Sequence, residues 1–433
     1  RVLCGVDLSG LDLDLNNLEV PMEQGKIQKW LAWNRIAMGL KWSPYQAVKS
    51  MHFAEEVIRG DRNDPANVFR WDYVRMNLPG QDNYDPSLPW VSKVKDLPSG
   101  DTVIAADLFT FVDDLRPTRS TKREGWQAGR RAASVVNWLG CQDAARKRRD
   151  SRKDPGAWAG CVVRTEGGVY ALVSDDKCAK MKAQLKELDG LLDTRPETLP
   201  RKRLEQICGF MNYVTQTYKY MIPYLNGLHM TIDGWRENRD SEGWKLPPPK
   251  RKSWEPIKAS VAEPPIPGTV QAKPRLFADV EALLSLCEDD KPPWRQVRPK
   301  HTAVVIYGFG DASGSSFGAS SKVAGAEDFH FEFGQWIASV TEEESSNWRE
   351  FTNVVEYLER RGAAGHLDES EVFMFTNNST TEAAFWKGNS HSRKLCELVL
   401  RLRQLELRTG MILHVVHVSG KRMIAQGTDG LSR

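Results

Sequence analysis

The segment FTFVDDLRPTR, from Phe109 to Arg119, places two adjacent aspartates behind strand-forming residues and shortly before two arginines. Like charges beside an apolar strand repel each other and lose hydration, so both carboxylates are disfavoured there. A bound divalent cation would remove this penalty, because Mg²⁺ prefers hard oxygen ligands. An isolated Asp-Asp pair is more often a solvated turn. The interpretation as a metal site therefore needs another acid that the fold could bring close.

Asp7 supplies such an acid. It ends a predicted short buried strand in the segment RVLCGVDLSG. Asp7, Asp113 and Asp114 together predict a two-metal carboxylate site. Two Mg²⁺ ions about 3.5–4 Å apart can activate an attacking 3′-hydroxyl and stabilise the leaving pyrophosphate. The predicted chemistry is nucleotidyl transfer.

A second set of polar residues falls near predicted strand ends in the last third of the chain. Asp311 ends the strand in TAVVIYGFGDASG, and Asn377 follows the strand in EVFMFTNN. Glu350 lies in a helix that we expect to be capped near Ser345, and Asp429 lies in a polar tail. The order of strand, strand, helix, strand, helix, strand predicts an α/β domain with these residues gathered together.

The positive charge of the chain is concentrated after the aspartate pair. Residues 116–153 contain twelve Lys or Arg and three acids, although the net charge of the whole chain is only +3. Such a block is most often a solvated face. Because this block directly follows two aspartates, we interpret it as a phosphate-binding surface for nucleic acid.

Composition limits the class of protein. A chain of 433 residues predicts two or three domains, and 40% hydrophobic with 27% charged residues is typical of soluble globular proteins. No apolar run is long enough to cross a bilayer, so no membrane partner is expected. Seven cysteines without C-x-x-C pairs indicate a reducing intracellular compartment, cytoplasm or nucleus. The start at Arg1 without Met suggests a fragment.

Several motifs resemble reverse transcriptases. FVDDL is similar to their Asp-Asp hairpin, CGVDLSG to their first palm strand, and MGLKWSPYQAVKSM to the Gly-x-x-x-Ser-Pro segment at the template and nucleotide. WAGCVVRTEGGVYALVSDDKCAKM resembles the primer-grip hairpin, and the segment after residue 300 resembles a ribonuclease H domain. NWRE, FTNNSTTEAAFWKG and HVSG are similar to retrotransposons of the DIRS/Ngaro type, which carry a tyrosine recombinase.

This resemblance implies an α+β palm with thumb and connection helices, followed by an α/β ribonuclease H-like domain. The implied domains are a palm with an insertion near 60–100, thumb or connection helices, a proline-rich linker and the ribonuclease H-like domain, at 1–185, 186–242, 243–300 and 301–433. The implied function is RNA-directed DNA polymerase with two Mg²⁺ per active site. The implied partners are RNA template, DNA primer, RNA–DNA hybrid and dNTP, while the oligomeric state stays open.

The resemblance also implies roles for individual residues. The polymerase metals would be held by Asp7, Asp113 and Asp114, and the ribonuclease H metals by Asp311, Glu350 and Asp429 with Asn377 at the fourth position. The nucleotide and template would meet Gly39, Ser43 and Pro44, with Asp12 near the sugar. The nucleic-acid phosphates would meet Arg116, Arg119, Lys122, Arg123, Arg130 and Arg131.

Three departures from the family pattern shape the expectations. Asn377 lacks the negative charge that would offset two cations, so we expect impaired ribonuclease H cleavage. Asp12 stands where an aromatic residue usually excludes a ribose 2′-hydroxyl, and basic fingers before Asp7 are absent. These departures leave open a second hypothesis, a decayed or domesticated scaffold that binds nucleic acid without turnover. His417 near the second site is equally compatible with a structural role.

Overall fold

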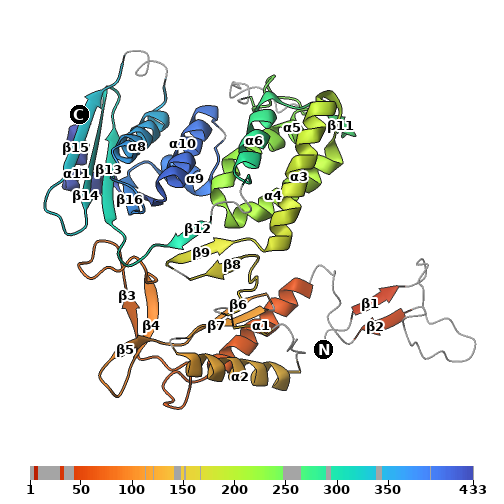
Figure 1. Cartoon of the computed structure of the whole chain (residues 1–433), viewed down its shortest axis with the longest axis vertical. Helices are drawn as coiled ribbons and strands as arrows, with labels where there is room; N and C mark the ends of the chain where they lie inside the picture. The colour runs from red at the N-terminus through yellow and green to blue at the C-terminus, as the bar shows by residue number, and fades with distance from the viewer. Residues whose placement is uncertain are drawn as a thin grey trace, which may run out of the picture. The chain divides into compact units, whose positions relative to one another are not determined.

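The computed structural model describes most of the chain (Figure 1). Side chains are described for residues within 44–112, 114–119, 121–140, 148–150, 153–165, 167–246, 265–288, 294–337, 344–390 and 392–432. The backbone is also described for the strands β1 (Cys4–Asp7) and β2 (Trp30–Trp33), which pair antiparallel. Helices and strands mix throughout, as expected. The chain divides into two compact units, Arg1–Met76 with Val91–Arg148 and Asn77–Trp90 with Arg149–Arg433.

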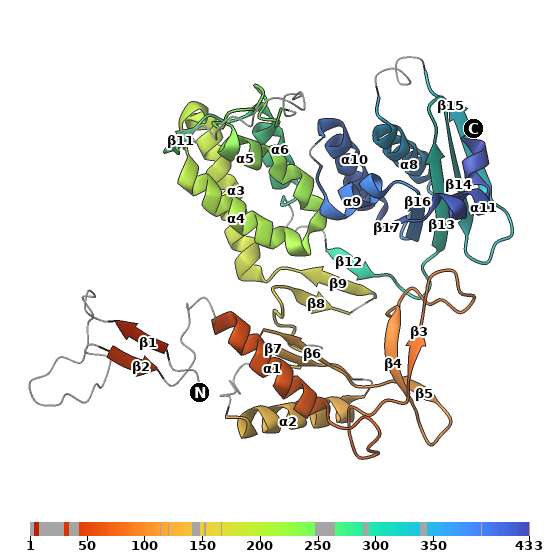
Figure 2. The ribbon, with the colours of Figure 1, turned by 180° about the vertical axis from the view of Figure 1, so that it is seen from behind.

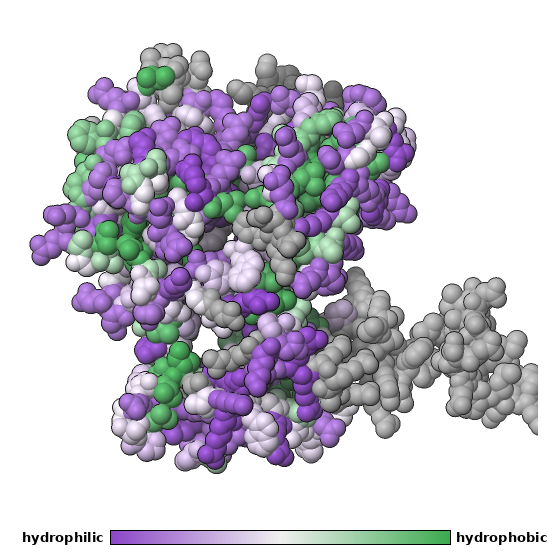
Figure 3. Space-filling model, viewed as in Figure 1, coloured by the Kyte–Doolittle hydropathy of each residue, from purple (hydrophilic) through white to green (hydrophobic). Residues whose placement is uncertain are grey.

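The first unit packs two helices against short strands. Its helices are α1 (Ser43–Arg59) and α2 (Lys122–Trp138). Its strands in the described part are β1, β2, β3 (Tyr73–Met76), β4 (Val91–Asp96), β5 (Thr102–Ile104), β6 (Leu108–Phe111) and β7 (Asp114–Pro117). Ile58, Leu108 and Ala128 are fully buried in its core, so that core joins α1, β6 and α2. Apolar side chains remain exposed over β3 and β4 (Figure 3).

Local sequence explains where both helices begin. Pro44 suits the first turn of α1 because a missing N–H costs nothing there. Thr121 caps α2, with its side chain accepting from the Glu124 N–H.

The second unit begins with a helical layer. Its helices are α3 (Asp175–Thr194), α4 (Arg201–Thr217), η4 (Lys219–Leu225), α5 (Asn226–Asp233) and α6 (Pro274–Ser285). A three-stranded sheet has the order β12 (Arg295–Arg298), β9 (Val169–Leu172), β8 (Val162–Arg164), and β10 (Leu199–Pro200) pairs with β11 (Thr269–Val270). The apolar stripe Leu204, Ile207 and Met211 is buried in the core of this layer, as its helical spacing predicts.

A five-stranded sheet forms the rest of the second unit (Figure 2). Its strand order is β15 (His330–Gln335), β14 (Ser316–Val323), β13 (Val305–Ala312), β16 (Glu371–Thr376), β17 (Ile412–His417). The first three strands are antiparallel, whereas β16 runs parallel to β13 and to β17. Parallel neighbours need crossover connections, which are provided by helices. These are α8 (Ser346–Ala363), α9 (Ser379–Lys387) and α10 (Arg393–Thr409).

The five-stranded sheet is packed against helices and against the C-terminal segment of the chain. Ile306, Val372 and Val415 point into the core shared with α8 and α10. The segment expected to be only a polar tail forms α11 (Gly420–Gln426) and η5 (Thr428–Leu431). Leu431 lies so close to Gly318 that a Cβ at position 318 would clash, so the C-terminal segment packs over β14.

Within the described residues, no helix has the length and apolarity needed to cross a membrane.

Candidate functional site

The hairpin of β6 and β7 carries the described part of the first predicted site. Phe111 pairs with Asp114 across the turn that begins at Val112. Val112 has a φ of +54°, which is strained for a β-branched residue. Backbone strain of this kind concentrates at functional sites. The turn presents Asp114 with an exposed side chain.

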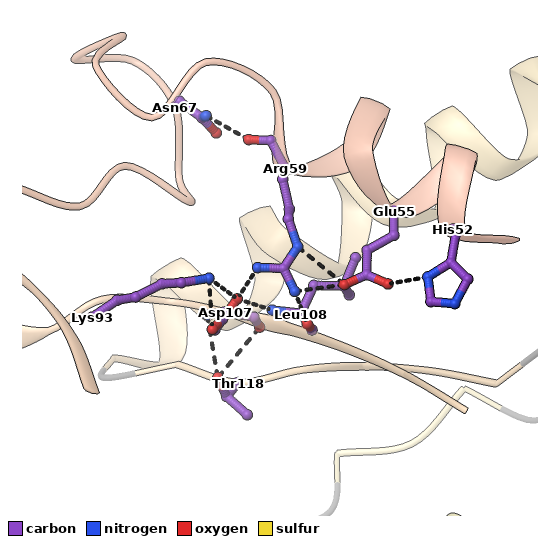
Figure 4. A network of polar contacts seen from close by, with 8 residues as sticks. All are labelled: His52, Glu55, Arg59, Asn67, Lys93, Asp107, Leu108 and Thr118. Carbon is purple, nitrogen blue, oxygen red and sulfur yellow. Dashed lines mark hydrogen bonds and ion pairs between the residues drawn. The ribbon is translucent and has the colours of Figure 1, made fainter. Parts of the chain in front are cut away.

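An ionic network fixes this hairpin to α1 (Figure 4). The Arg59 guanidinium donates to Asp107 Oδ1 at 2.6 Å and to the Leu108 carbonyl at 2.5 Å. It also donates to Glu55 Oε1 on its own helix, at 2.6 and 3.1 Å. Burial acts to raise the pKa of Glu55, but the bonds from Arg59 outweigh it and lower that pKa. Arg59 thus links the last turn of α1 to the first residues of β6.

Asp107 receives further support from other elements. Lys93 Nζ lies 3.1 Å from Asp107 Oδ2, and Thr118 donates its backbone N–H to the Asp107 carbonyl at 2.7 Å. On the far side, Asn67 Nδ2 donates to the Arg59 carbonyl at 2.7 Å. Contacts from several strands and loops therefore hold the base of the hairpin.

The structure places the predicted polymerase residues unevenly. Asp113, Gly39 and Asp12 lie outside the described residues, and Asp7 is described only as the last backbone position of β1. Ser43 and Pro44 open α1, the helix that Arg59 ties to the hairpin. The convergence of the Asp7, Asp113 and Asp114 side chains remains a prediction.

The basic block divides into different environments. Lys122, Arg123 and Arg130 are exposed along α2, and the Arg130 guanidinium lies 4.7 Å from the centre of the Trp126 ring. Arg131 instead donates from Nε to the Ile58 carbonyl at 2.6 Å and is half-buried. Its guanidinium satisfies a carbonyl in the last turn of α1. Arg116 and Arg119, the remaining members of the predicted phosphate surface, are half-buried.

In the second unit, Asp311 and Asn377 meet at the ends of β13 and β16. Asp311 is 5% exposed, and its Oδ1 accepts a hydrogen bond of 2.9 Å from Asn377 Nδ2. Its Oδ2 accepts from Ser432 Oγ at 2.5 Å, and Ser432 Oγ also lies 3.0 Å from the Asp429 carbonyl. β13 and β16 are parallel neighbours, which explains why their ends bring Asp311 and Asn377 together.

Glu350 enters the same cluster from α8. Burial first, and then the charges of Asp311 and Asp429, raise the pKa of Glu350 to about 8. Its Oε2 atom is buried and has no hydrogen-bond partner. A buried carboxylate next to other acids favours its protonated form unless a cation lies nearby.

Two members of this cluster were not predicted from the sequence. Ser432 bridges Asp311 and the turn of Asp429, and Asn353 donates from Nδ2 to the carbonyls of Asp311 and Gly318 at 3.0 and 2.8 Å. Asn353 lies three residues after Glu350 on α8 and is 2% exposed. An i, i+3 amide beside a predicted catalytic acid is the signal that could have identified it.

The donor chemistry of this cluster fits Mg²⁺, because the cluster offers carboxylate oxygens and one orphaned Oε2. The spacing is less suitable. Within the described residues, no three Asp, Glu, His or Cys side chains form a group that could hold a metal ion. The Asn377 amide, which donates to Asp311, takes the position where a fourth acid is expected.

Comparison with known proteins gives only distant matches. No protein-family model and no curated protein matches the sequence. Among solved structures, a foamy viral protease-reverse transcriptase in complex with dsDNA has a TM-score of 0.36 and 11% identity, covering 91% of this chain and 62% of that one. A second structure, of the foamy viral protease-reverse transcriptase dRH in complex with ds DNA, has a TM-score of 0.31 and 9% identity, covering 72% of this chain and 46% of that one.

Ribonucleases H match 30% of the chain. RNase H1 from the halophilic archaeon Halobacterium salinarum NRC-1 has a TM-score of 0.23 and 16% identity, covering 30% of this chain and 93% of that one. This chain spans less than two thirds of the foamy viral chains it matches. Because all these TM-scores are below 0.5, the fold is defined here by its own topology.

Proposed function

We propose that the chain is a nucleic-acid-processing enzyme of the reverse transcriptase type, with a ribonuclease H-like unit whose cleavage is impaired. The observation that carries the proposal is the contact of Asp311 with Asn377 at the ends of the parallel strands β13 and β16, beside the buried Glu350, on which the charges of Asp311 and Asp429 act. A buried acid such as Glu350, whose pKa is raised by burial and by neighbouring carboxylates, is typical of sites built for a cation or a proton. The order of strands and helices supports the ribonuclease H-like assignment. The motifs further support a palm, a thumb and a retrotransposon origin of the DIRS/Ngaro type.

Each proposed site has its own set of ligands. Asp311, Glu350 and Asp429 would hold Mg²⁺ in the second unit, and Asp7, Asp113 and Asp114 would hold it in the first. When bound, Mg²⁺ would supply charge to stabilise the phosphodiester undergoing reaction. Asn377 leaves the second unit one negative charge short, so its affinity for a pair of cations is low. The partners would be RNA template, DNA primer, dNTP and RNA–DNA hybrid.

The test for the second unit is cleavage of an RNA–DNA hybrid with Mg²⁺, comparing the natural chain with Asn377→Asp. We expect the natural chain to cleave at least tenfold more slowly than Asn377→Asp, because the missing carboxylate weakens the metal site. Equal rates would overturn the proposed impairment. For the first unit, primer extension on an RNA template should occur and be abolished by Asp113→Asn.

A second candidate function is a scaffold that binds nucleic acid without turnover. The hydrogen bond from Asn377 to Asp311 favours it, because an amide satisfies that carboxylate without a metal. Binding of hybrid with unchanged affinity in the presence of EDTA, together with no cleavage and no primer extension, would select the scaffold.

A further inference from the structure

The long connection between β3 and β4 leaves the first unit. Met76 pairs with Val91, and the Asn77 N–H donates to the Trp90 carbonyl at 2.8 Å, so the ladder continues into the start of the connection. Residues 77–90, called here the docking loop, nevertheless belong to the second compact unit. They lie within the insertion near 60–100, to which the proposed function assigns no role.

The docking loop has a defined internal structure. Asn77 is 5% exposed, and its Nδ2 donates to the Asp85 carbonyl at 2.8 Å while its Oδ1 accepts from the Asp85 N–H at 2.9 Å. Asp85 Oδ1 in turn accepts from the N–H and hydroxyl of Ser87 at 2.8 and 2.6 Å. Such a loop loses little conformational freedom when it binds a surface.

Polar contacts join the loop to the five-stranded sheet. The Tyr84 hydroxyl donates to Glu371 Oε2 at 2.5 Å, and His414 Nε2 lies 3.0 Å from Glu371 Oε1. The Gly80 N–H donates to the Tyr307 hydroxyl at 2.6 Å. Glu371 is 1% exposed, so loss of Tyr84 would leave one of its buried oxygens without this donor. Burial, together with the Glu371 carboxylate, raises the pKa of Tyr84.

Aromatic contacts surround the same carboxylate. Phe373 stacks on His414 with ring centres 4.6 Å apart. The ring centres of Tyr84 and Trp90 each lie 6.1 Å from that of Phe373. Trp90 also lies 5.7 Å from His414. Phe373 is 2% exposed. These rings contribute apolar burial as well as favourable edge and offset geometry.

We propose that the docking loop is a built-in binding element for the face of the sheet formed by Tyr307, Glu371, Phe373 and His414. Through it, the β3–β4 hairpin of the first unit and the sheet of the second unit are thermodynamically linked. The loop contacts Glu371, the first residue of β16, and Asn377 follows the last residue of that strand. This inference does not depend on the proposed enzymatic function, and its tests use no activity.

The first test replaces residues 78–89 in the full chain with Asn-Gly, the two-residue turn favoured between paired strands. The β3–β4 ladder can then close directly, and the sheet loses its cover. We expect amide hydrogen exchange in β16 and β17 to become at least tenfold faster, with new binding of an apolar dye. Unchanged protection in both strands would overturn the proposal.

The second test uses single substitutions that leave the backbone intact. Trp90→Ala should speed exchange of the Gly80 amide and of β16 at least fivefold, whereas Trp138→Ala, at a position 76% exposed, should change neither. Tyr84→Phe should act in the same direction as Trp90→Ala, with Tyr73→Phe on the exposed β3 as its matched control. Equal exchange in Trp90→Ala and Trp138→Ala would contradict the linkage, even if the shortened loop failed to fold.

Discussion

Asn377 donates its side-chain N–H to Asp311 Oδ1 at 2.9 Å, across the ends of two parallel strands. This bond has opposite consequences with and without a metal ion. Without metal, the amide satisfies a buried carboxylate that is 5% exposed. With metal, the same amide supplies no charge.

Asn377→Asp therefore should destabilise the second unit in EDTA. It removes the donor and sets a second carboxylate against Asp311, which costs about 1–3 kcal/mol of unfolding free energy. Mg²⁺ should restore much of this loss. Urea denaturation with and without Mg²⁺ measures both effects. Asn378→Asp is the matched control: an aspartate still caps α9 but loses the bond that Asn378 donates to Asn347, so any loss of stability should be the same with and without Mg²⁺.

Glu350→Gln should alter how stability depends on pH. The pKa of Glu350 is raised from 4.5 to about 8, so the folded state binds a proton that the unfolded state releases. Stability from this group is fully present below about pH 4.5 and is lost as the pH rises to about 8. In EDTA we compare the free energy of unfolding of Glu350→Gln with that of the natural chain. The difference in favour of the variant should be about 1–3 kcal/mol larger at pH 8 than at pH 5. Parallel stability curves from pH 5 to pH 8 would contradict this.

Arg59→Ala should destabilise the first unit, because Asp107, Glu55 and the Leu108 carbonyl all lose a donor. Arg59 is only partly buried, so we expect a loss of about 1–3 kcal/mol. Arg62→Ala is the control, since Arg62 stacks on Trp71 outside this network. Chemical denaturation followed by hydrogen exchange in β6 would locate the effect. Equal losses in both variants would show that the network does not hold the hairpin.

Val112→Asn should stabilise the hairpin turn. Asn adopts a positive φ more readily than a β-branched residue, so the gain should be about 0.5–1 kcal/mol. Val112→Ile keeps the strain and serves as the control. If the strain serves the proposed polymerase site, primer extension by Val112→Asn should fall although its stability rises. The comparison requires thermal unfolding and extension rates for the same three proteins.

The sequence predicts the local elements that depend on short-range chemistry. Pro44 marks where α1 begins, and the apolar spacing of Leu395, Leu398 and Leu402 places one face of α10 in the core. The meeting of Asp311 with Asn377 also follows from strand order.

Contacts between distant segments were not predictable in this way. Ser432 joins the acid cluster through tertiary packing and has no sequence signature of its own, whereas Asn353 is marked only by its i, i+3 spacing from Glu350. The polar composition of residues 60–100 indicated an excursion, yet Tyr84 and Trp90 find partners in strands near the other end of the chain. Local propensity carries no information about such partners.

The docking loop also has a consequence for synthesis of the chain on the ribosome. Tyr84 is separated from Glu371 by 287 residues, so the loop emerges long before its binding surface exists. At common translation rates this delay is roughly 15–60 s. During it the nascent hairpin exposes Tyr84 and Trp90 to solvent and to chaperones. Docking is therefore a late event in folding, and it completes only when β16 and β17 have left the exit tunnel.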